Sequence, residues 1–502
     1  MSGPHHNDQE RSSSNGHARG DFDLHAAARR VLLSAEFVLD YDDAVRRQVE
    51  QITGPAASVP GVRDMRDRLW SSIDNTESRD LDQVEIAESL PDGTIRLTVA
   101  IADVDALVAK GSPIDLRARA NATSVYTGLD VFPMLPEELS TGYTSLSEGE
   151  DRVAIAIESV VSAAGDVVST DVYRALVHNH AKLAYDDVGA WLDGGVRPAK
   201  VVANAALEAQ LELQHEASRR LKAERVRNGA LEFETIEATP VSKDGKVVDL
   251  KIVHKNHARD LIEDFMIASN VTIAKFLEAR GRSGIRRVVR EPERWSRIVE
   301  LAGRYGTALP PEPDSLALAH FLAERRTADP DRFPDLSLSI VKLMGPGIYA
   351  LDLPGKDPGG HFGLATHDYS HATAPNRRYA DLVTQRLVKA SLLNLPASYS
   401  DDELADIAKH CTEREDAENK VERAIRKTVA ALMLSGRIGE SFDAIVTGAN
   451  DKGTFVRTLH PPAEGMVVRN HAGYDVGDKV RVKLVGADPQ RSFIDFEGQG
   501  MR

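Results

Sequence analysis

The sequence is almost without cysteine. Cys411 is the only one among 502 residues, so no internal disulfide bond can form. Because disulfides persist in oxidising compartments, this absence argues against a disulfide-stabilised secreted protein and favours the cytoplasm. Long apolar runs are also missing, and none reaches the roughly 18 residues that span a bilayer, so we expect no membrane association. The polar first twenty residues lack the apolar segment of a signal peptide.

An excess of positive charge is missing as well. The 62 Lys and Arg residues are outnumbered by 77 Asp and Glu residues, which gives a net charge of −15. This argues against a protein that coats nucleic acid through its bulk charge. A local basic channel stays compatible with the total, because salt screens charges beyond about 10 Å. The sequence contains no phosphate-cradling Walker pattern, so we expect no nucleotide cofactor.

The residues that are present describe a globular chain. Hydrophobic residues make up 42% and charged residues 28%, as in ordinary globular proteins, and the length favours two or three domains. The sequence predicts, in order, a disordered tail over residues 1–21, a helical N-terminal segment and linker over 22–61, an α/β domain over 62–436, and a small all-β barrel over 437–502.

Hydrophobic periodicity supports these divisions. Helix-like spacing over 22–52 predicts a helical segment, which Asp40–Asp43 interrupt. The α/β domain has predicted strands at 94–104 and within 152–177, and predicted helices at 204–225, 261–281, 376–393 and 402–435. After Gly439, five short stretches of β-forming residues alternate with turn residues. Five strands in so short a region are typical of an OB-type barrel.

Three aspartates, Asp74, Asp80 and Asp82, lie within nine positions. Mg²⁺ prefers oxygen ligands, and metal-assisted phosphodiester hydrolysis needs carboxylates that hold ions about 3.5–4 Å apart. In an extended segment, Asp80 and Asp82 point the same way because side chains alternate with period two. Spacing alone, however, favours a solvated loop, since loops readily accept Asp.

The surrounding residues change this balance, because several segments occur in a recognisable order. These are WSSIDNTESRDLDQ (70–83), VAIADVDALVAKGSPID (99–115), NATSVYTGLDVFPMLPEELS (121–140), LIEDFMIASN (261–270), HFGL (361–364) and YSHATAPNRRYADLVTQR (369–386). Together they resemble the catalytic RNB domain of the RNase II / RNase R exoribonucleases, and the last 60 residues resemble the S1-type OB domain that ends these enzymes. The resemblance implies an α/β catalytic domain with a channel for single-stranded RNA, and 3′-to-5′ hydrolysis that releases nucleoside 5′-monophosphates.

The resemblance also implies roles for the acidic cluster. Asp74, Asp80 and Asp82 match the first three acids of the family's metal-binding motif, and Asp80 and Asp82 are also the candidate catalytic acids. The implied ion is Mg²⁺, with Mn²⁺ as the alternative. The family has a fourth acid at the position of Gln83. A glutamine offers a metal a neutral carbonyl oxygen without charge, so Gln83 brings full two-metal occupancy into question.

Further residues match family positions that handle RNA. Arg377, in APNRRYADL, is the implied catalytic arginine that supports the scissile phosphate, and Arg378 is expected to bind a neighbouring phosphate. Tyr126 is expected to stack on the terminal base, since base–aromatic stacking tolerates any sequence. Phe233 is a candidate second half of this clamp, with a place in the core as its alternative. Glu418 matches a glutamate near the terminal nucleotides, with an ordinary helix surface charge as its alternative.

Two other groups of residues attract attention. The stretch 281–297 carries six Arg against two Glu, which fits either a phosphate track or a solvated face. His361, His367 and His371 lie within eleven residues, but they lack the matched Cys or acid set that zinc sites usually have. We therefore expect no zinc site there.

Only about 73 residues precede Asp74, too few for the two cold-shock-type domains that the family usually carries there. We expect a shortened, monomeric 3′-to-5′ exoribonuclease acting on single-stranded RNA. Two alternatives stay open. Gln83 favours a catalytically weakened RNA-binding or regulatory protein, and the short N-terminal region favours a factor that trims only a few nucleotides.

Overall fold

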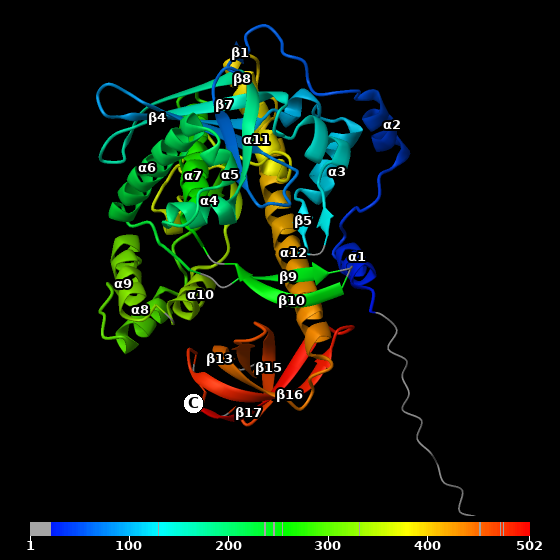
Figure 1. The fold of residues 1–502 in the computed structure, drawn as a ribbon, viewed down its shortest axis with the longest axis vertical. Coiled ribbons are helices and arrows are strands. Elements are labelled where there is room, and N and C mark those ends of the chain that lie inside the picture. Colours follow the sequence, from blue (N-terminus) through cyan, green and yellow to red (C-terminus); the bar gives the residue numbers. More distant parts are fainter. Residues whose placement is uncertain are drawn as a thin grey trace, which may run out of the picture.

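A computed structural model describes residues 22–128, 130–234, 237–243, 246–253, 255–330, 332–450, 453–471, 473–474 and 476–501. The tail predicted for residues 1–21 lies outside them. Helices surround a curled sheet in the larger part of the molecule, and a small barrel lies beneath it (Figure 1). Among the described helices, none combines the length and the apolar character needed to cross a bilayer.

The main sheet has six strands in the order β1-β8-β2-β3-β4-β7, and β8 also pairs with β7. Its strands are β1 (Arg63–Asp64), β2 (Trp70–Asp74), β3 (Gln83–Ser89), β4 (Ile95–Ala102), β7 (Asp151–Val161) and β8 (Val167–Ala184). The strand predicted at 94–104 is β4, and the pair predicted within 152–177 is β7 and β8. β4 lies between β3 and β7 in the sheet. Its mostly apolar residues are buried there, and Val99 and Ile101 are each only 1% exposed.

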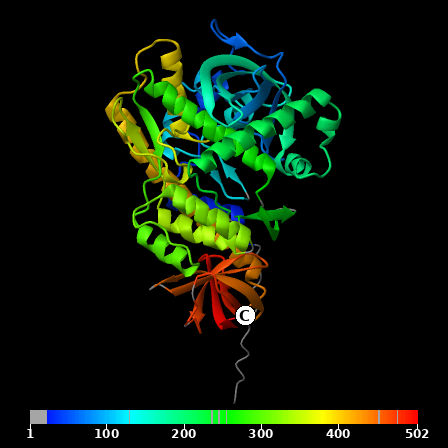
Figure 2. The same ribbon diagram turned by 90° about the vertical axis from the view of Figure 1, so that its left-hand side faces the viewer.

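Helices α4 (Tyr185–Leu192), α6 (Ala205–Arg227) and α7 (His257–Glu278) form one packed group, in which α7 contacts both of the others. Figure 2 shows α6 and α7 lying along the sheet. The sequence predicts the start of α7 at residue 261, but the helix begins earlier. The side chain of Asn256 accepts a hydrogen bond from the backbone N–H of Arg259, and this N-cap sets the start.

The remaining elements of this part are α3 (Pro113–Asn121), α5 (Ala199–Val202), α8 (Trp295–Arg304), α9 (Ser315–Ala328), α10 (Phe333–Met344) and α11 (Tyr379–Leu392), with short helices η1 (Val104–Ala106), η2 (Glu138–Tyr143) and η3 (Phe362–Leu364). Three two-stranded sheets accompany them: β5 (Val125–Tyr126) with β6 (Val131–Phe132), β9 (Glu237–Lys243) with β10 (Lys246–Val253), and β11 (Gly284–Val288) with β12 (Ile348–Asp352).

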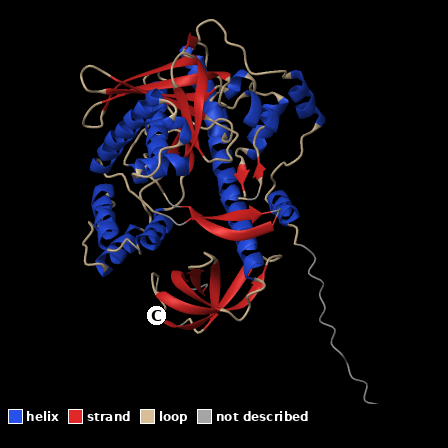
Figure 3. Cartoon of the chain, viewed as in Figure 1, coloured by secondary structure: helices blue, strands red, loops and turns tan. Residues whose placement is uncertain are grey.

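The long helix α12 (Asp401–Leu434) joins the sheet region to the barrel (Figure 3). It begins at a capping box, in which the Ser400 side chain and the Glu403 side chain each bond the other residue's backbone. Its second half buries Ile425 and Val429 in the same core as barrel residues such as Phe496. The α/β domain and the barrel therefore share an apolar junction on this helix.

The five strands predicted after Gly439 are confirmed. β13 (Ser441–Asn450), β14 (Gly453–Thr458), β15 (Glu464–Arg469), β16 (Lys479–Asp488) and β17 (Phe493–Met501) close a barrel in the order β13-β14-β15-β17-β16. A buried ion pair between Arg457 and Asp335, at 2.6 Å, ties this barrel to α10. The predicted fold class, an α/β domain followed by an OB-type barrel, is confirmed.

The N-terminal segment forms two helices, α1 (Leu24–Ser34) and α2 (Asp43–Gln51). The two helices are separated at Asp40–Asp43, where the sequence predicts an interruption. There the side chain of Asp42 caps α2 by accepting a hydrogen bond from the backbone N–H of Val45. α1 packs on α12 and buries Ala28 and Leu32 there. These short helices are therefore part of the packed structure.

Candidate active site

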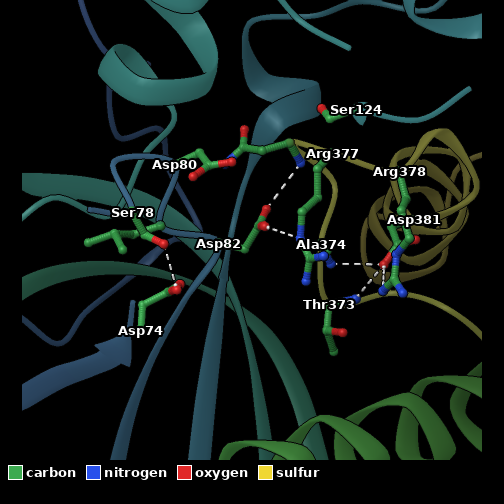
Figure 4. A network of polar contacts seen from close by, with 12 residues as sticks. Asp74, Ser78, Asp80, Asp82, Ser124, Thr373, Ala374, Arg377, Arg378 and Asp381 are labelled. Atoms are coloured by element: carbon green, nitrogen blue, oxygen red, sulfur yellow. Dashed lines mark hydrogen bonds and ion pairs between the residues drawn. The ribbon is translucent and has the colours of Figure 1, made fainter. Parts of the chain in front are cut away.

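Segments that are far apart in the sequence meet at one place beside the sheet (Figure 4). Asp74 ends β2, and the loop after it carries Asp80 and Asp82 into β3. The β5–β6 hairpin brings Tyr126, and the loop before α11 brings Arg377. The strand ends and the helix start fix these side chains on an ordered frame.

Asp82 is nearly buried, with 3% of its surface exposed. One carboxylate oxygen accepts a hydrogen bond from the backbone N–H of Asn376 at 3.1 Å, and the other accepts one from Nε of Arg377 at 3.2 Å. Burial raises the pKa of Asp82 to about 7, against the attraction of Arg377 and with a further upward contribution from Asp80. The site therefore holds an acid whose charge a nearby cation would stabilise.

A buried aspartate at the start of α11 fixes the loop over residues 373–378, which carries Arg377 and Arg378. This segment is called the arginine loop below. One oxygen of Asp381 accepts hydrogen bonds from the backbone N–H groups of Thr373 and Ala374, at 2.9 and 2.8 Å, and from the Arg378 guanidinium at 2.7 Å. Asp381 is fully buried. It fixes the turn that presents Arg377, whose side chain stays 47% exposed. Arg378 is instead held in the ion pair with Asp381.

The other two aspartates have different partners. The hydroxyl of Tyr126 donates to a carboxylate oxygen of Asp80 at 2.8 Å. Asp74 accepts hydrogen bonds from the Ser78 hydroxyl at 2.7 Å and from the backbone N–H of Asn75 at 2.6 Å. Burial raises the pKa of Asp74, and these two hydrogen bonds oppose the rise.

These groups line a cavity of about 520 Å³. The acids Asp74, Asp80 and Asp82 line it together with Gln83, and the cationic residues Arg377, Arg259 and Arg426 line it as well. Carboxylates and cations in one cavity suit a phosphodiester, because acids hold a hard cation while guanidinium groups pair with phosphate oxygens.

A smaller recess of about 100 Å³ adjoins the site, and Tyr126, Arg377, Arg378 and Glu418 line it. Burial raises the pKa of Glu418 to about 8, and the nearby negative charges of Glu422 and Glu415 add to the rise. The predicted residue Glu418 thus lies close to the predicted Tyr126, Arg377 and Arg378. Its carboxyl group is held largely neutral near pH 7.

Phe233 lies elsewhere. It packs against the apolar cluster of α8, α9 and α10 and lines a separate cavity of about 320 Å³ with Lys222 and Arg225 of α6. The structure therefore does not bring Phe233 together with Tyr126. The alternative interpretation, an aromatic residue in a core, describes its surroundings better.

Two arginines of the basic stretch 281–297 have internal roles. Arg286 is buried and pairs with Asp352 at 2.6 Å and with Asp368 at 3.0 Å. Arg287 forms two hydrogen bonds to Glu415, at 2.5 and 2.7 Å. For these two residues, both interpretations of the stretch, a phosphate track and a solvated face, are wrong.

Two of the three histidines in 361–371, His361 and His371, pack against the ring of Tyr369 and have hydrogen-bond partners of their own. His371 is paired with the hydroxyl of Tyr349 at 2.8 Å, whereas Nδ1 of His361 accepts a hydrogen bond from the backbone N–H of Leu364 at 3.1 Å. Burial lowers the pKa of His361 to about 4. His367 is exposed.

The donor set of the large cavity fits a hard divalent cation. Asp74, Asp80, Asp82 and Gln83 line it, and the side-chain oxygens of Asp and Gln are typical ligands of Mg²⁺ and Mn²⁺. Within the described ranges, no three His, Cys, Asp or Glu side chains are grouped closely enough to hold a metal ion by themselves. Mg²⁺ usually binds through one or two carboxylates together with water and substrate phosphate, so a closed cage is not required.

The sequence does not predict the roles of two buried acids in this region, Asp381 and Glu85. Asp381 belongs to a recognised segment, but only the structure reveals that it anchors the arginine loop. Glu85 lies in β3, fully buried, and neither of its carboxylate oxygens has a hydrogen-bond partner. The sequence signal for Glu85 is an acid between the apolar residues Val84 and Ile86.

Family models match both parts of the chain. Residues 62–394 match the RNB domain, and residues 440–499 match the RNase II-type exonuclease C-terminal S1 domain. The chain therefore belongs to the RNB family of exoribonucleases, as the sequence segments predict.

Curated relatives and solved structures agree with this assignment. The chain is 28% identical to ribonuclease R 1 of Lactococcus lactis, with 93% of this chain and 60% of that protein aligned. It is 30% identical to ribonuclease R of Escherichia coli, with 90% of this chain and 56% of that protein aligned. The chain thus spans about three fifths of the length of these curated relatives.

The fold is similar to that of the apo form of Mycoplasma genitalium RNase R, with a TM-score of 0.86 at 23% identity, covering 95% of this chain and 78% of that one. It is also similar to yeast Ssd1, a pseudonuclease, with a TM-score of 0.71 at 18% identity, covering 92% of this chain and 57% of that one. Similar folds therefore occur with and without nuclease activity.

Proposed function

We propose that this protein is a 3′-to-5′ exoribonuclease that hydrolyses single-stranded RNA with the help of Mg²⁺ or Mn²⁺ and releases nucleoside 5′-monophosphates. The observation that carries the proposal is the convergence of Asp74, Asp80, Asp82, Arg377 and Tyr126 on one cavity. Related ribonuclease R of M. genitalium has been solved in complex with ribose-methylated single-stranded RNA, which supports the choice of substrate. A cytoplasmic location and a monomeric state stay predictions.

Each side chain has a distinct task in this proposal. Tyr126 stacks on the terminal base, and Arg377 donates hydrogen bonds to the scissile phosphate as negative charge develops on it. Asp74, Asp80, Asp82 and the Gln83 amide would hold the divalent ion, which would supply Lewis-acid stabilisation of the phosphate when bound. Asp80 and Asp82 also orient the attacking water. The water oxygen forms a bond to phosphorus as the water gives up a proton, and the bond from phosphorus to the 3′ oxygen of the preceding nucleotide breaks. That 3′ oxygen takes up a proton and becomes a hydroxyl, and the phosphate stays as the 5′-phosphate of the released nucleotide.

Arg378 and Glu418 are proposed to sit near the last nucleotides of the RNA. Both line the recess that continues from Tyr126. Because Arg378 is tied to Asp381, we expect it to act on RNA mainly through the shape of the arginine loop. Phe233 has no place beside the terminal base in this scheme.

The test uses 5′-labelled poly(A) incubated with purified protein and Mg²⁺, with products resolved on a sequencing gel. Wild-type protein should shorten the RNA, whereas Asp82→Asn should bind it and lower the cleavage rate at least ~100-fold, the scale of losing one preorganised charged group. Shortening of the labelled RNA by Asp82→Asn at the wild-type rate would contradict the assignment of this site.

Gln83 favours a second candidate function, RNA binding with little or no cleavage. The family resemblance places a fourth acid at this position, whereas the neutral residue Gln83 lines the cavity here. Binding of the labelled RNA without any shortening by wild-type protein would support this candidate. A ladder that stops after a few nucleotides would instead support a trimming factor.

A further inference from the structure

The β5–β6 hairpin that carries Tyr126 has two faces. Val125 and Tyr126 are neighbours on β5, so their side chains point to opposite sides. Tyr126 donates to Asp80 and lines the large cavity. Val125 is buried in the apolar cluster that α1 and α12 share, and its cross-strand partner Phe132 packs against the same cluster. The hairpin therefore presents the tyrosine ring to the site from an apolar base that the N-terminal segment helps to build.

The turn of this hairpin is bonded directly to α1. Nδ1 of His25, in the first turn of α1, donates a hydrogen bond to a carboxylate oxygen of Asp130, because an ionised carboxylate can only accept. The backbone N–H of Asp130 donates to the Thr127 hydroxyl at 2.9 Å, and its carbonyl oxygen accepts from the backbone N–H of Thr127 at 3.0 Å. Thr127 and Gly128 line the large cavity beside Tyr126. His25 is thus linked, through Asp130, to the turn that adjoins the tyrosine.

The end of the hairpin is tied to the same N-terminal segment. The guanidinium of Arg117, on α3, donates to the carbonyl oxygens of Pro133 and Met134, at 3.2 and 2.7 Å. It also donates to the carbonyl oxygen of Val38 at 3.0 Å, and Arg117 is buried. The side chain of Asn121 bonds both the backbone N–H and the carbonyl oxygen of Val38, each at 2.9 Å. The N-terminal segment is therefore linked to the hairpin at its turn and again at its end.

We propose that residues 24–38 position Tyr126 for the terminal base, and that His25 and Arg117 are the positioning residues that hold the β5–β6 hairpin against the site. A base that stacks on the ring binds more tightly when the hairpin is already in place, because ordering a loop during binding costs free energy. The inference rests on the proposed function for the RNA base, but the hold on the hairpin can be measured without RNA.

The first measurement is hydrogen–deuterium exchange of residues 123–134 in the full chain without RNA. His25→Ala removes the bond to Asp130 and should speed exchange in the hairpin about threefold, the scale of losing an exposed ion pair. His25→Asn should restore much of the protection, because its amide can donate to Asp130 in place of the imidazole. His320→Ala is the matched control, since His320 is an exposed histidine on α9 and should leave the hairpin unchanged.

The second measurement is the affinity for 5′-fluorescein-labelled oligo(A) by fluorescence anisotropy, in Asp82→Asn protein so that the RNA stays intact. His25→Ala should weaken binding about threefold. This loss should vanish when Tyr126→Ala is also present, because two residues that act through one contact are not additive. Arg117→Lys should weaken binding more, about tenfold, because a lysine cannot bridge the three carbonyl oxygens. Its loss should vanish in the Tyr126→Ala background as well.

Wild-type exchange in the hairpin of His25→Ala would overturn the proposal. An affinity loss of equal size with and without Tyr126 would also overturn it, because His25 would then act on RNA by another route. If Arg117→Lys does not fold, the variants of the exposed residue His25 decide alone. Failure of the proposed function looks different: faster hairpin exchange in His25→Ala, together with an Asp82→Asn protein that binds no RNA, would support the hold on the hairpin and contradict the proposed function.

Discussion

Nε of Arg377 lies 3.2 Å from a carboxylate oxygen of Asp82, although 295 residues separate them in the sequence. In this pair the Arg377 side chain is 47% exposed, whereas the Asp82 side chain is almost completely buried. The bond to Asp82 uses Nε and holds Arg377 in place on the wall of the cavity. A phosphate entering the cavity would therefore meet a guanidinium that is already oriented.

This geometry predicts that Arg377→Lys is a poor substitute. A lysine keeps the charge but cannot reproduce a bond from Nε together with a fork toward phosphate. We expect kcat to fall ~100-fold or more, the scale of losing an aimed donor, with a smaller change in KM. Arg426→Lys is the control: Arg426 lines the same cavity from α12 and should mainly alter RNA affinity and its salt dependence. Equal kcat losses in both variants would contradict a special role for Arg377.

The contact between Tyr126 and Asp80 separates two roles of the tyrosine. Tyr126→Phe keeps the ring and loses the hydroxyl that donates to Asp80 at 2.8 Å, whereas Tyr126→Ala loses both. We expect the alanine variant to weaken RNA binding by about 1–3 kcal/mol and the phenylalanine variant to keep most of the affinity. Binding should be measured in an Asp82→Asn background, so that the RNA stays intact. Equal weakening by the two variants would rule out stacking as the main contribution.

Local patterns in the sequence predict much of this fold. β4 and the barrel strands follow from β-forming residues between turns, and α12 follows from a long helical pattern. The contact between Asp82 and Arg377 has no local signal, because it joins distant segments. Only the resemblance to the RNB family predicts that Asp82 and Arg377 lie in the same site.

Where sequence reasoning fails, tertiary contacts decide. The sequence makes Phe233 a candidate for stacking on RNA, but its side chain packs against the apolar cluster of α8, α9 and α10. Arg286 and Arg287 lie in a basic stretch, yet acids from other elements pair with them. Glu85 stands between apolar residues, and only the structure shows that its carboxyl group is fully buried without a hydrogen-bond partner.

The hydrogen bonds that Asp381 accepts predict that replacing it destabilises the folded protein at the arginine loop. Its removal in Asp381→Ala would leave the buried N–H groups of Thr373 and Ala374 without an acceptor and the Arg378 charge without its partner. We expect a loss of about 3–5 kcal/mol in the free energy of unfolding, as for breaking a buried charged network, and loss of cleavage. Asp381→Asn keeps one acceptor oxygen and should lose less. Urea denaturation followed by circular dichroism measures both variants, and equal midpoints for Asp381→Ala and wild type would refute the role.

The raised pKa of Glu418 predicts how stability and RNA binding depend on pH. The folded protein holds this proton up to about pH 8, whereas the unfolded chain releases it near the ordinary value of 4.5. Folding therefore takes up a proton between these pH values, and the free energy of unfolding that Glu418 contributes falls as pH rises from 4.5 to 8. The size is roughly 1–3 kcal/mol, because one pKa unit corresponds to about 1.4 kcal/mol and solvent screening reduces it for a partly exposed group.

Glu418→Gln should remove this part of the pH dependence and be more stable than wild type at pH 9. RNA affinity should follow the same direction, since a carboxylate formed above pH 8 in the recess repels phosphate, whereas the glutamine variant stays neutral. Glu413→Gln is the control, because Glu413 is an exposed residue on the same helix. Urea midpoints and RNA binding to Asp82→Asn protein at pH 6, 7, 8 and 9 measure both effects. If Glu418→Gln and Glu413→Gln give parallel profiles, the carboxyl group of Glu418 is not held neutral by its surroundings, and the recess beside Tyr126 is more open to water than its burial indicates.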